Sequence, residues 1–189
     1  QLARNGEFDV AVMAEQQTKG RGRSGNDWIS PKGNLYLSLI VADKVALKDA
    51  GQLSFVTAVA LYNTLKKHTD SKLEQKWPND LLLNGKKVSG ILLESEAAGQ
   101  NAQWIVIGLG VNIQNAPENA SRLEGEVSPQ KLAQLFLIEF SNVLDLWRKS
   151  GFDQVRGMWV ENAKGIGQNI SVRLPRETKV GVFKDIDET

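Results

Sequence analysis

The segment Gln16 to Trp28, which reads QQTKGRGRSGNDW, combines glycine with basic side chains in a way that suits anion binding. Its glycines are Gly20, Gly22 and Gly25, and its cations are Lys19, Arg21 and Arg23. Glycine lets the backbone approach a ligand closely, and arginine binds phosphate or carboxylate through two parallel hydrogen bonds. The spacing matches neither a Walker A loop nor a dinucleotide-binding fingerprint. The segment is therefore a loop around an anion such as a nucleotide phosphate, a solvated basic turn, or an RNA-binding Arg-Gly segment.

A second cluster follows at Lys76 to Asp80, where the sequence reads KWPND. Pro78 ends a short strand, so Lys76 and Asp80 are expected at a rigid corner beside a buried tryptophan. A lysine on a rigid element can act as a fixed point charge on a carboxylate or an α-phosphate oxygen. Asn79 and Asp80 could contact a metal or a hydroxyl group. The alternative is an ordinary Pro-Asn-Asp turn with an exposed lysine.

A third cluster, Gly108 to Asn112 (GLGVN), places two glycines inside an otherwise apolar strand. Glycine weakens a strand and often marks a place where a ligand or another backbone comes close. Asn112 could then contact a base edge or a ribose. Tight packing within the sheet is the competing explanation.

The elements that must position these clusters indicate an α+β fold, a mostly antiparallel sheet with helices packed on one side. Strands are predicted at 8–15, 34–42, 72–77, 81–83, 88–94, 103–113, 169–174 and 179–184. Helices are predicted at 49–68, from Ser128 as N-cap to Gly151, and at 152–164. Asn84-Gly85 predicts a tight hairpin turn. We expect one domain over residues 1–167 and the truncated start of a small C-terminal β domain over 168–189.

The composition excludes several kinds of site. The 189 residues include no cysteine and one histidine, which excludes disulfides, thiol nucleophiles and multi-histidine metal sites. A formal net charge of +1 gives no bulk attraction to nucleic acid or to an anionic membrane. No apolar stretch approaches the roughly 20 residues of a membrane helix. We expect His68 to be structural at a helix end, and Lys66-Lys67 and Lys86-Lys87 to be solvated.

Taken together, the motifs resemble biotin protein ligase in order and spacing along essentially the whole chain. The set comprises AEQQT at 14–18, GRGRSG at 20–25, Trp28, Ser30-Pro31, GNLY at 33–36, KWPND at 76–80, VSGIL at 88–92 and GLGVN at 108–112. The resemblance implies a catalytic domain at 1–167 that joins biotin to ATP, with Mg²⁺, and releases pyrophosphate. It implies that the biotinyl group of biotinyl-5′-AMP then passes to a lysine of a biotin carboxyl carrier protein. A cytoplasmic location is expected, and a homodimer is left open.

The resemblance assigns the biotin side of the site first. The loop from Gly20 to Gly25 would fold over biotin and the adenylate. Gln17 and the backbone around Arg21 and Gly22 would meet the ureido end of biotin. Lys76 would hold the biotin carboxylate and the non-bridging phosphate oxygens, which makes it, with Arg23, the predicted catalytic pair.

The nucleotide side follows from the same resemblance. Arg23 would bind the phosphate, Trp28 would lie beside the adenine, and Asn79 and Asn112 would be polar contacts to the nucleotide. Asp80 is a hypothesis for orienting or deprotonating the incoming acceptor lysine. No protein ligand to a metal is assigned.

The sequence also departs from the family pattern. The family commonly shows GRGRxGRxW, and Asn26 stands here at the last arginine position. One cation is therefore missing from the loop, and looser retention of the adenylate is expected. The family's Ser-Thr-Asn biotin-contacting segment would lie before Gln1, its C-terminal barrel-like domain would begin near Asn169, and no DNA-binding helix-turn-helix is evident.

Three other functions compete with the biotin ligase interpretation, one of them the Arg-Gly RNA-binding protein, which the net charge of +1 disfavours. Lipoate protein ligases and octanoyl transferases share the fold and the acyl-transfer logic, although GRGR and KWPND argue against both. A non-catalytic nucleotide-binding module is the third alternative, favoured by the neutral side chain at Asn26.

Overall fold

Six antiparallel strands form the main sheet of the computed structural model, which describes residues 1–41, 45–173 and 177–187. In order across the sheet the strands run β1-β2-β6-β5-β4-β3. Their bounds are β1 (Val10–Ala14), β2 (Leu35–Val41), β3 (Leu73–Lys76), β4 (Asp80–Leu83), β5 (Lys86–Ala98) and β6 (Asn101–Val111). The two longest strands, β5 and β6, thus lie at the centre of the sheet.

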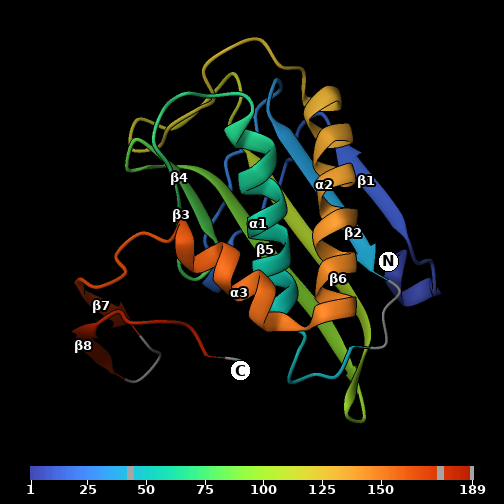
Figure 1. Ribbon diagram of the computed structural model, residues 1–189. Coiled ribbons are helices and arrows are strands. Elements are labelled where there is room, and N and C mark those ends of the chain that lie inside the picture. The colour runs from blue at the N-terminus through green and yellow to red at the C-terminus, as the bar shows by residue number, and fades with distance from the viewer. Residues whose placement is uncertain (42–44, 174–176, 188–189) are drawn as a thin grey trace.

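Three helices cover one face of this sheet: α1 (Gln52–Lys66), α2 (Pro129–Ser150) and α3 (Phe152–Glu161) (Figure 1). Side chains alternate between the two faces of a strand, so every second residue of β2 and β6 points towards the helices. These residues belong to the same buried cluster as Phe136 of α2 and Trp159 of α3: they are Leu35, Leu37, Leu39, Ile105, Ile107 and Leu109. Fully burying each such side chain contributes about 1.5–3 kcal/mol. The three α-helices leave the other face of the sheet open, and this face carries the site described below.

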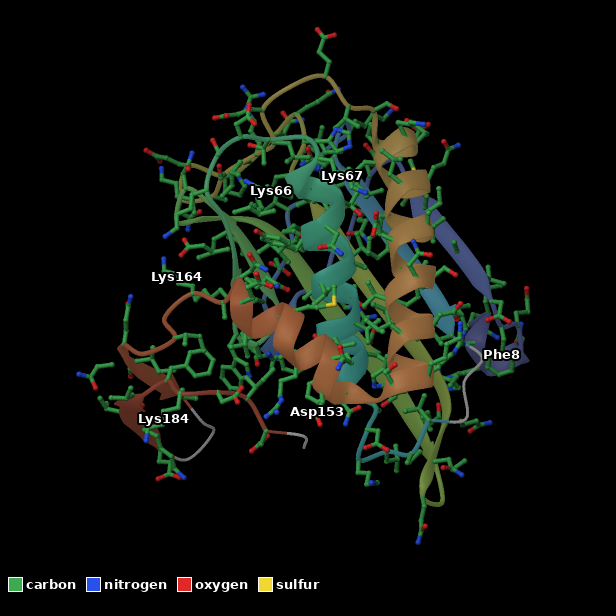
Figure 2. All side chains as sticks on the ribbon, viewed as in Figure 1. Phe8, Lys66, Lys67, Asp153, Lys164 and Lys184 are labelled. Carbon is green, nitrogen blue, oxygen red and sulfur yellow. The ribbon has the colours of Figure 1, made fainter. Side chains whose placement is uncertain are left out.

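A second sheet of two strands, β7 (Asn169–Arg173) and β8 (Thr178–Val182), follows α3 (Figure 1), and β7 residues line the same cavity as the main sheet. The segment leading to it is attached to β3, because the Lys164 amide donates to the Gln75 carbonyl at 2.7 Å. Figure 2 shows Lys164 on this connecting segment, on the side of the molecule where the small sheet lies. The division at residues 167 and 168 stays a prediction.

The predicted α+β class, with its mostly antiparallel sheet and its helices on one side, is confirmed. Asn84 and Gly85 both have positive φ, 50° and 80°, as a type I′ hairpin turn requires. The Ser128 hydroxyl accepts a hydrogen bond from the Lys131 amide at 3.2 Å and caps α2. Two short 3-10 helices, η1 (Ala3–Asn5) and η2 (Arg23–Gly25), were not predicted.

Most differences concern element ends. Helix α1 begins at Gln52 because residues 47–51 form consecutive turns. The central hairpin extends past Glu94 as an exposed ribbon without apolar alternation. Ala42 and Leu174, the predicted ends of two strands, lie outside the described residues, as does Thr189. Lys66 and Lys67 lie at the end of α1 (Figure 2), and Lys67 is ion-paired with Glu139 of α2 rather than simply solvated.

Candidate active site

A cavity of about 1220 Å³ lies on the face of the main sheet that the helices leave open. Its floor contains glycines from the two central strands, Gly90 of β5 and Gly108 and Gly110 of β6. Gly90 and Gly110 are direct partners in the sheet register. Because glycine has no side chain, this part of the floor is bare backbone that other groups can approach closely.

The indole of Trp28 occupies part of that bare floor. A Cβ atom at Gly110 would lie 2.5 Å from Trp28 Nε1, and one at Gly90 would lie 3.2 Å from Trp28 Cζ3. The indole nitrogen is buried, and within the described part of the chain nothing accepts its hydrogen. Gly110 therefore provides the seat for Trp28, whereas a Cβ at Gly108 would meet only ordinary contacts at 3.6 Å or more.

The glycine-rich segment folds as a closed hairpin, which we call the flap (residues 20–28). Its two ends are joined by a hydrogen bond from the Trp28 amide to the Gly20 carbonyl at 3.0 Å. A Cβ at Gly20 would lie only 2.3 Å from the Trp28 carbonyl oxygen, so no larger residue fits there. Ser24 and Gly25 both have left-handed φ angles, 56° and 77°, at the tip. The segment predicted to surround an anion therefore has a defined backbone conformation.

Two arginines attach the flap to the sheet. Arg21 Nη2 lies 3.0 Å from Glu94 Oε2 on β5. Arg23 Nη1 donates to Asn79 Oδ1 at 3.3 Å, and the Asn79 amide nitrogen in turn donates to the Ile91 carbonyl. Asn79 therefore links the flap to β5 through both ends of its side chain.

The corner at Lys76 to Asp80 connects β3 to β4, and Lys76 and Asp80 are partners in the register of these strands. The peptide bond between Trp77 and Pro78 is cis. Lys76 is exposed at the rim of the cavity, and Trp77 is 38% exposed. The prediction of a buried tryptophan beside Lys76 was therefore wrong, because this side chain turns outward at the corner instead of packing into the core.

Lys87 was missed as a site residue and is part of the cavity wall. Its Nζ lies 2.7 Å from Asp80 Oδ1 and 5.2 Å from the centroid of the Trp28 ring. Its path runs past Gly90, where an added Cβ would lie 3.1 Å from Nζ. The expectation of a solvated Lys86-Lys87 pair is thus corrected for Lys87. The sequence contained one indication of this role, because Gly90 follows three residues later and leaves room for a side chain. The pairing of β4 with β5 shifts its register between Leu81 and Leu82, so the sequence does not reveal which of the two lysines faces Asp80.

Most of the predicted site residues come together in this cavity. Those that line it are Gln17, Arg21, Gly22, Arg23, Trp28, Lys76, Asn79 and Asp80. Gln17 Oε1 lies 2.8 Å from the Ser30 hydroxyl, which donates to it. Gly20 joins the two ends of the flap through its carbonyl group, and it is not among the residues that line the cavity.

Asn112 is the predicted site residue that the structure does not bring to the cavity. It is buried, and its amide donates to the Ser121 carbonyl at 2.9 Å. This bond connects the end of β6 to the segment that follows it. The predicted nucleotide contact of Asn112 stays a prediction, and the structure assigns the side chain a structural hydrogen bond.

The segment that follows the flap is anchored by Tyr36 on β2. Its hydroxyl donates to the Pro31 carbonyl at 2.8 Å. Burial raises the pKa of Tyr36 above its ordinary value of 10.0, by more than the neighbouring Asn34 side chain lowers it. The hydroxyl therefore stays a hydrogen-bond donor through the neutral range.

The cavity is rich in cations but has no ready-made metal cage. Within residues 1–41, 45–173 and 177–187, no group of three or more His, Cys, Asp or Glu side chains converges as metal ligands. Three carboxylates line the cavity, Asp27, Asp80 and Glu94, and the last two are ion-paired with Lys87 and Arg21. Nor does any helix in these ranges have the length and apolarity needed to cross a membrane.

Comparison with known proteins places this arrangement in a family. The model of the biotin/lipoate A/B protein ligase family matches residues 5–112. The chain is 35% identical to the biotin--[acetyl-CoA-carboxylase] ligase of Paracoccus denitrificans, over 94% of this chain and 80% of that protein. It is 32% identical to the bifunctional ligase/repressor BirA of Bacillus subtilis, again over 94% of this chain but only 58% of that protein.

A solved structure shows the same fold. The biotin protein ligase from Aquifex aeolicus in complex with biotin and ATP superimposes with a TM-score of 0.82 at 26% identity, over 96% of this chain and 79% of that one. The family model alone covers more than half of the chain. The chain belongs to the biotin/lipoate A/B protein ligase family.

Proposed function

We propose that this chain adenylates biotin with ATP and transfers the biotinyl group to a lysine of a biotin carboxyl carrier protein. The observation that carries the proposal is the hydrogen bond between Arg23 and Asn79, which holds a cationic flap closed beside the glycine-floored cavity. The relatives named above as biotin ligases support biotin as the acid. Because the chain covers little more than half of BirA, activities of the longer relatives beyond ligation are not part of this proposal.

The first step brings two anions together. A carboxylate oxygen of biotin attacks the α-phosphorus of ATP, the bond to the bridging oxygen breaks, and pyrophosphate leaves. The protein has to screen the charges and hold the reacting atoms in line. Arg23, Lys76 and Lys87 all line the cavity and supply that screening.

The two lysines are placed differently for this task. Lys87 lies against the Trp28 ring and is held by Asp80, so its position is fixed on two sides. Lys76 is exposed at the rim. We therefore assign the contact with the reacting carboxylate and α-phosphate to Lys87 together with Arg23, and retain Lys76 as a rim contact to the outgoing phosphates.

In the second step the acceptor lysine attacks the biotinyl carbonyl, an amide bond forms and AMP leaves. The attacking amine has to be neutral, so the acceptor ammonium must first give one proton to Asp80 or to water, and its nitrogen loses a second proton to solvent as the amide forms and AMP leaves. Asp80 is the carboxylate at the corner of the cavity and is the residue proposed to orient the acceptor amine. Asp80 is ion-paired with Lys87, so the residue proposed for the second step is in direct contact with a residue proposed for the first.

Mg²⁺ enters this proposal as the counter-ion of the ATP substrate. Magnesium commonly binds through substrate phosphates plus one or two carboxylates and keeps several waters. Asp80 and Glu94 are already ion-paired with Lys87 and Arg21. We therefore expect Mg²⁺ to arrive bound to the phosphates of ATP rather than to occupy a site built from these carboxylates. When bound, it neutralises charge on the leaving pyrophosphate.

Closure of the flap protects the product of the first step. Biotinyl-5′-AMP is a mixed anhydride that water hydrolyses, so a loop that excludes water preserves it until the carrier arrives. The attachments of Arg21 to Glu94 and of Arg23 to Asn79 keep the flap against the sheet. Use of ATP and the absence of cysteine fit the cytoplasm, where we place the reaction.

The test is an incubation of the chain with ATP, Mg²⁺ and either biotin or lipoate, with pyrophosphate release as the measurement. Biotin-dependent release supports the proposal, and lipoate-dependent release would establish the sister activity instead. Binding of ATP with no release for either acid would indicate a nucleotide-binding module. A carrier protein added in a second stage should gain one biotinyl group per acceptor lysine.

A further inference from the structure

Asn26 closes the tip of the flap through three of its groups. Its backbone amide and its side-chain Nδ2 both donate to the Arg23 carbonyl, at 3.1 and 3.0 Å. Its own carbonyl accepts a hydrogen bond from the Gly22 amide at 2.7 Å. The turn that presents Arg23 is therefore tied on both sides by one residue.

The turn needs such a bond because its backbone is unfavourable. Ser24 lies in the left-handed region at φ 56°, which a residue with a Cβ atom rarely adopts because Cβ approaches the following carbonyl oxygen. A side-chain hydrogen bond within the turn favours the turn conformation and so opposes that backbone cost. The Nδ2 bond of Asn26 thus stabilises a turn that the local sequence disfavours.

The same position is occupied by arginine in the GRGRxGRxW pattern that this chain otherwise resembles. The donors of an arginine lie several bonds farther from its backbone than Nδ2 does, so an arginine cannot close this turn in the same compact way. Asn26 also lines the cavity, yet its amide is directed to the Arg23 carbonyl. The substitution therefore exchanges a cation for a hydrogen bond within the flap.

We propose that Asn26 is a positioning residue, which pre-organises the flap before any ligand binds and so directs Arg23 across the cavity to Asn79. The proposal rests on the proposed function for the role of Arg23, but its structural part concerns the ligand-free chain alone. It also revises the expectation of looser adenylate retention, since the lost charge is matched by a more rigid flap.

The structural part is tested by amide hydrogen exchange of residues 20–28 without ligand, in wild type and in Asn26→Ala and Asn26→Arg variants. Both variants lose the Nδ2 bond, so exchange of the Gly22 and Trp28 amides should accelerate about 2- to 12-fold, the equivalent of one side-chain hydrogen bond. Asn119→Ala, an exposed asparagine of another loop, is the matched control and should leave these amides unchanged. Unchanged exchange in both Asn26 variants would overturn the proposal.

The positioning part is tested by non-additivity. Asn26→Ala should lower kcat/KM for biotin in the pyrophosphate assay by about the same 2- to 12-fold, and should have no further effect in an Arg23→Ala background. An equal loss in both backgrounds would show that Asn26 does not act through Arg23. Gain of kcat/KM in Asn26→Arg would mean that the missing charge matters more than the turn.

These outcomes are separate from the fate of the proposed function. If wild-type chain releases no pyrophosphate with biotin, the ligase proposal fails, while the exchange rates still decide whether Asn26 orders the flap. If the chain is active and the exchange rates do not change, the ligase proposal survives and the inference on Asn26 fails.

Discussion

Lys87 Nζ lies 2.7 Å from Asp80 Oδ1, and the same ammonium group lies 5.2 Å from the centroid of the Trp28 ring. One lysine thus connects the corner at the end of β3, the central strand β5 and the flap. The contact exists because Gly90 leaves room beside it. Removal of the ammonium group would leave the Asp80 carboxylate without its counter-ion next to the reacting groups, so the effect should be larger than for an exposed lysine.

Lys87→Ala is therefore expected to lower kcat/KM for biotin adenylation about 100-fold or more, because removing one preorganised group that stabilises developing charge costs about 10²–10³. Lys76→Ala should cost about 10-fold or less, since its exposed side chain is screened by water. Pyrophosphate release at varied biotin concentration measures both. A larger loss in Lys76→Ala would restore the sequence-based assignment of Lys76 as the catalytic lysine.

The packing of the Trp28 indole against Gly110 can be tested by substituting two glycines of β6. In Gly110→Ala the new methyl group would lie 2.5 Å from Trp28 Nε1, so the indole must move, and we expect a loss of about 1–3 kcal/mol in unfolding free energy. Gly108→Ala is the control from the same strand and floor, since its Cβ meets no atom closer than 3.6 Å. Urea titration of the ligand-free chain measures both.

A double variant sharpens this comparison. If the clash with Trp28 causes the loss, Gly110→Ala should cost much less in a Trp28→Ala background, where the indole is absent. The same loss in both backgrounds would show that the alanine strains the strand itself. ATP binding, measured separately, should weaken in Gly110→Ala as the displaced indole enters the cavity.

How far the sequence predicts this site depends on the range of the interactions. Asn84-Gly85 and Ser128-Pro129 specify local structure through their own backbone preferences, and both predictions are confirmed. Arg23 and Lys76 both line one cavity, and each belongs to a short motif with a defined local geometry, while their catalytic roles stay predictions.

The features that were missed depend on contacts between distant segments. Lys87 reaches Asp80 only because of the register shift at Leu81 and Leu82, which no local pattern reveals. The outward turn of Trp77 depends in the same way on what surrounds the corner. Gly110 was singled out as a site of close approach, but the approaching group is a side chain from 82 positions earlier, Trp28.

Asp80→Asn separates the two proposed steps. Asparagine keeps the shape of the side chain but removes the charge, so orientation of an incoming ammonium should weaken. We expect the rate of transfer from preformed biotinyl-5′-AMP to the carrier protein to fall about 10-fold or more. General acid–base catalysis typically contributes about 10²–10⁴-fold, which sets the upper limit of the expected loss. Transfer at the wild-type rate would remove Asp80 from the second step, even if adenylation were impaired through Lys87.

The alkaline limit of stability should depend on Tyr36. Burial raises the pKa of this tyrosine in the folded chain, so its neutral form is favoured by folding. Its contribution is therefore fully present below the unfolded pKa of about 10 and is lost as the pH rises through the higher folded pKa. Tyr36→Phe should cost about 1 kcal/mol at pH 7, because the Pro31 carbonyl loses its donor, yet it should flatten the decline above pH 10.

Tyr62 provides the matched comparison, because burial and the nearby Glu161 also raise its pKa. Unfolding free energies from urea titrations between pH 7 and 11 should show part of the alkaline decline remaining in each single Tyr→Phe variant and most of it removed in the double variant. The Tyr36→Phe loss at pH 7 should also be accompanied by weaker biotin-dependent pyrophosphate release, since Pro31 follows the flap closely in the chain. A decline above pH 10 that is as steep in the double variant as in wild type would show that neither tyrosine controls the alkaline limit.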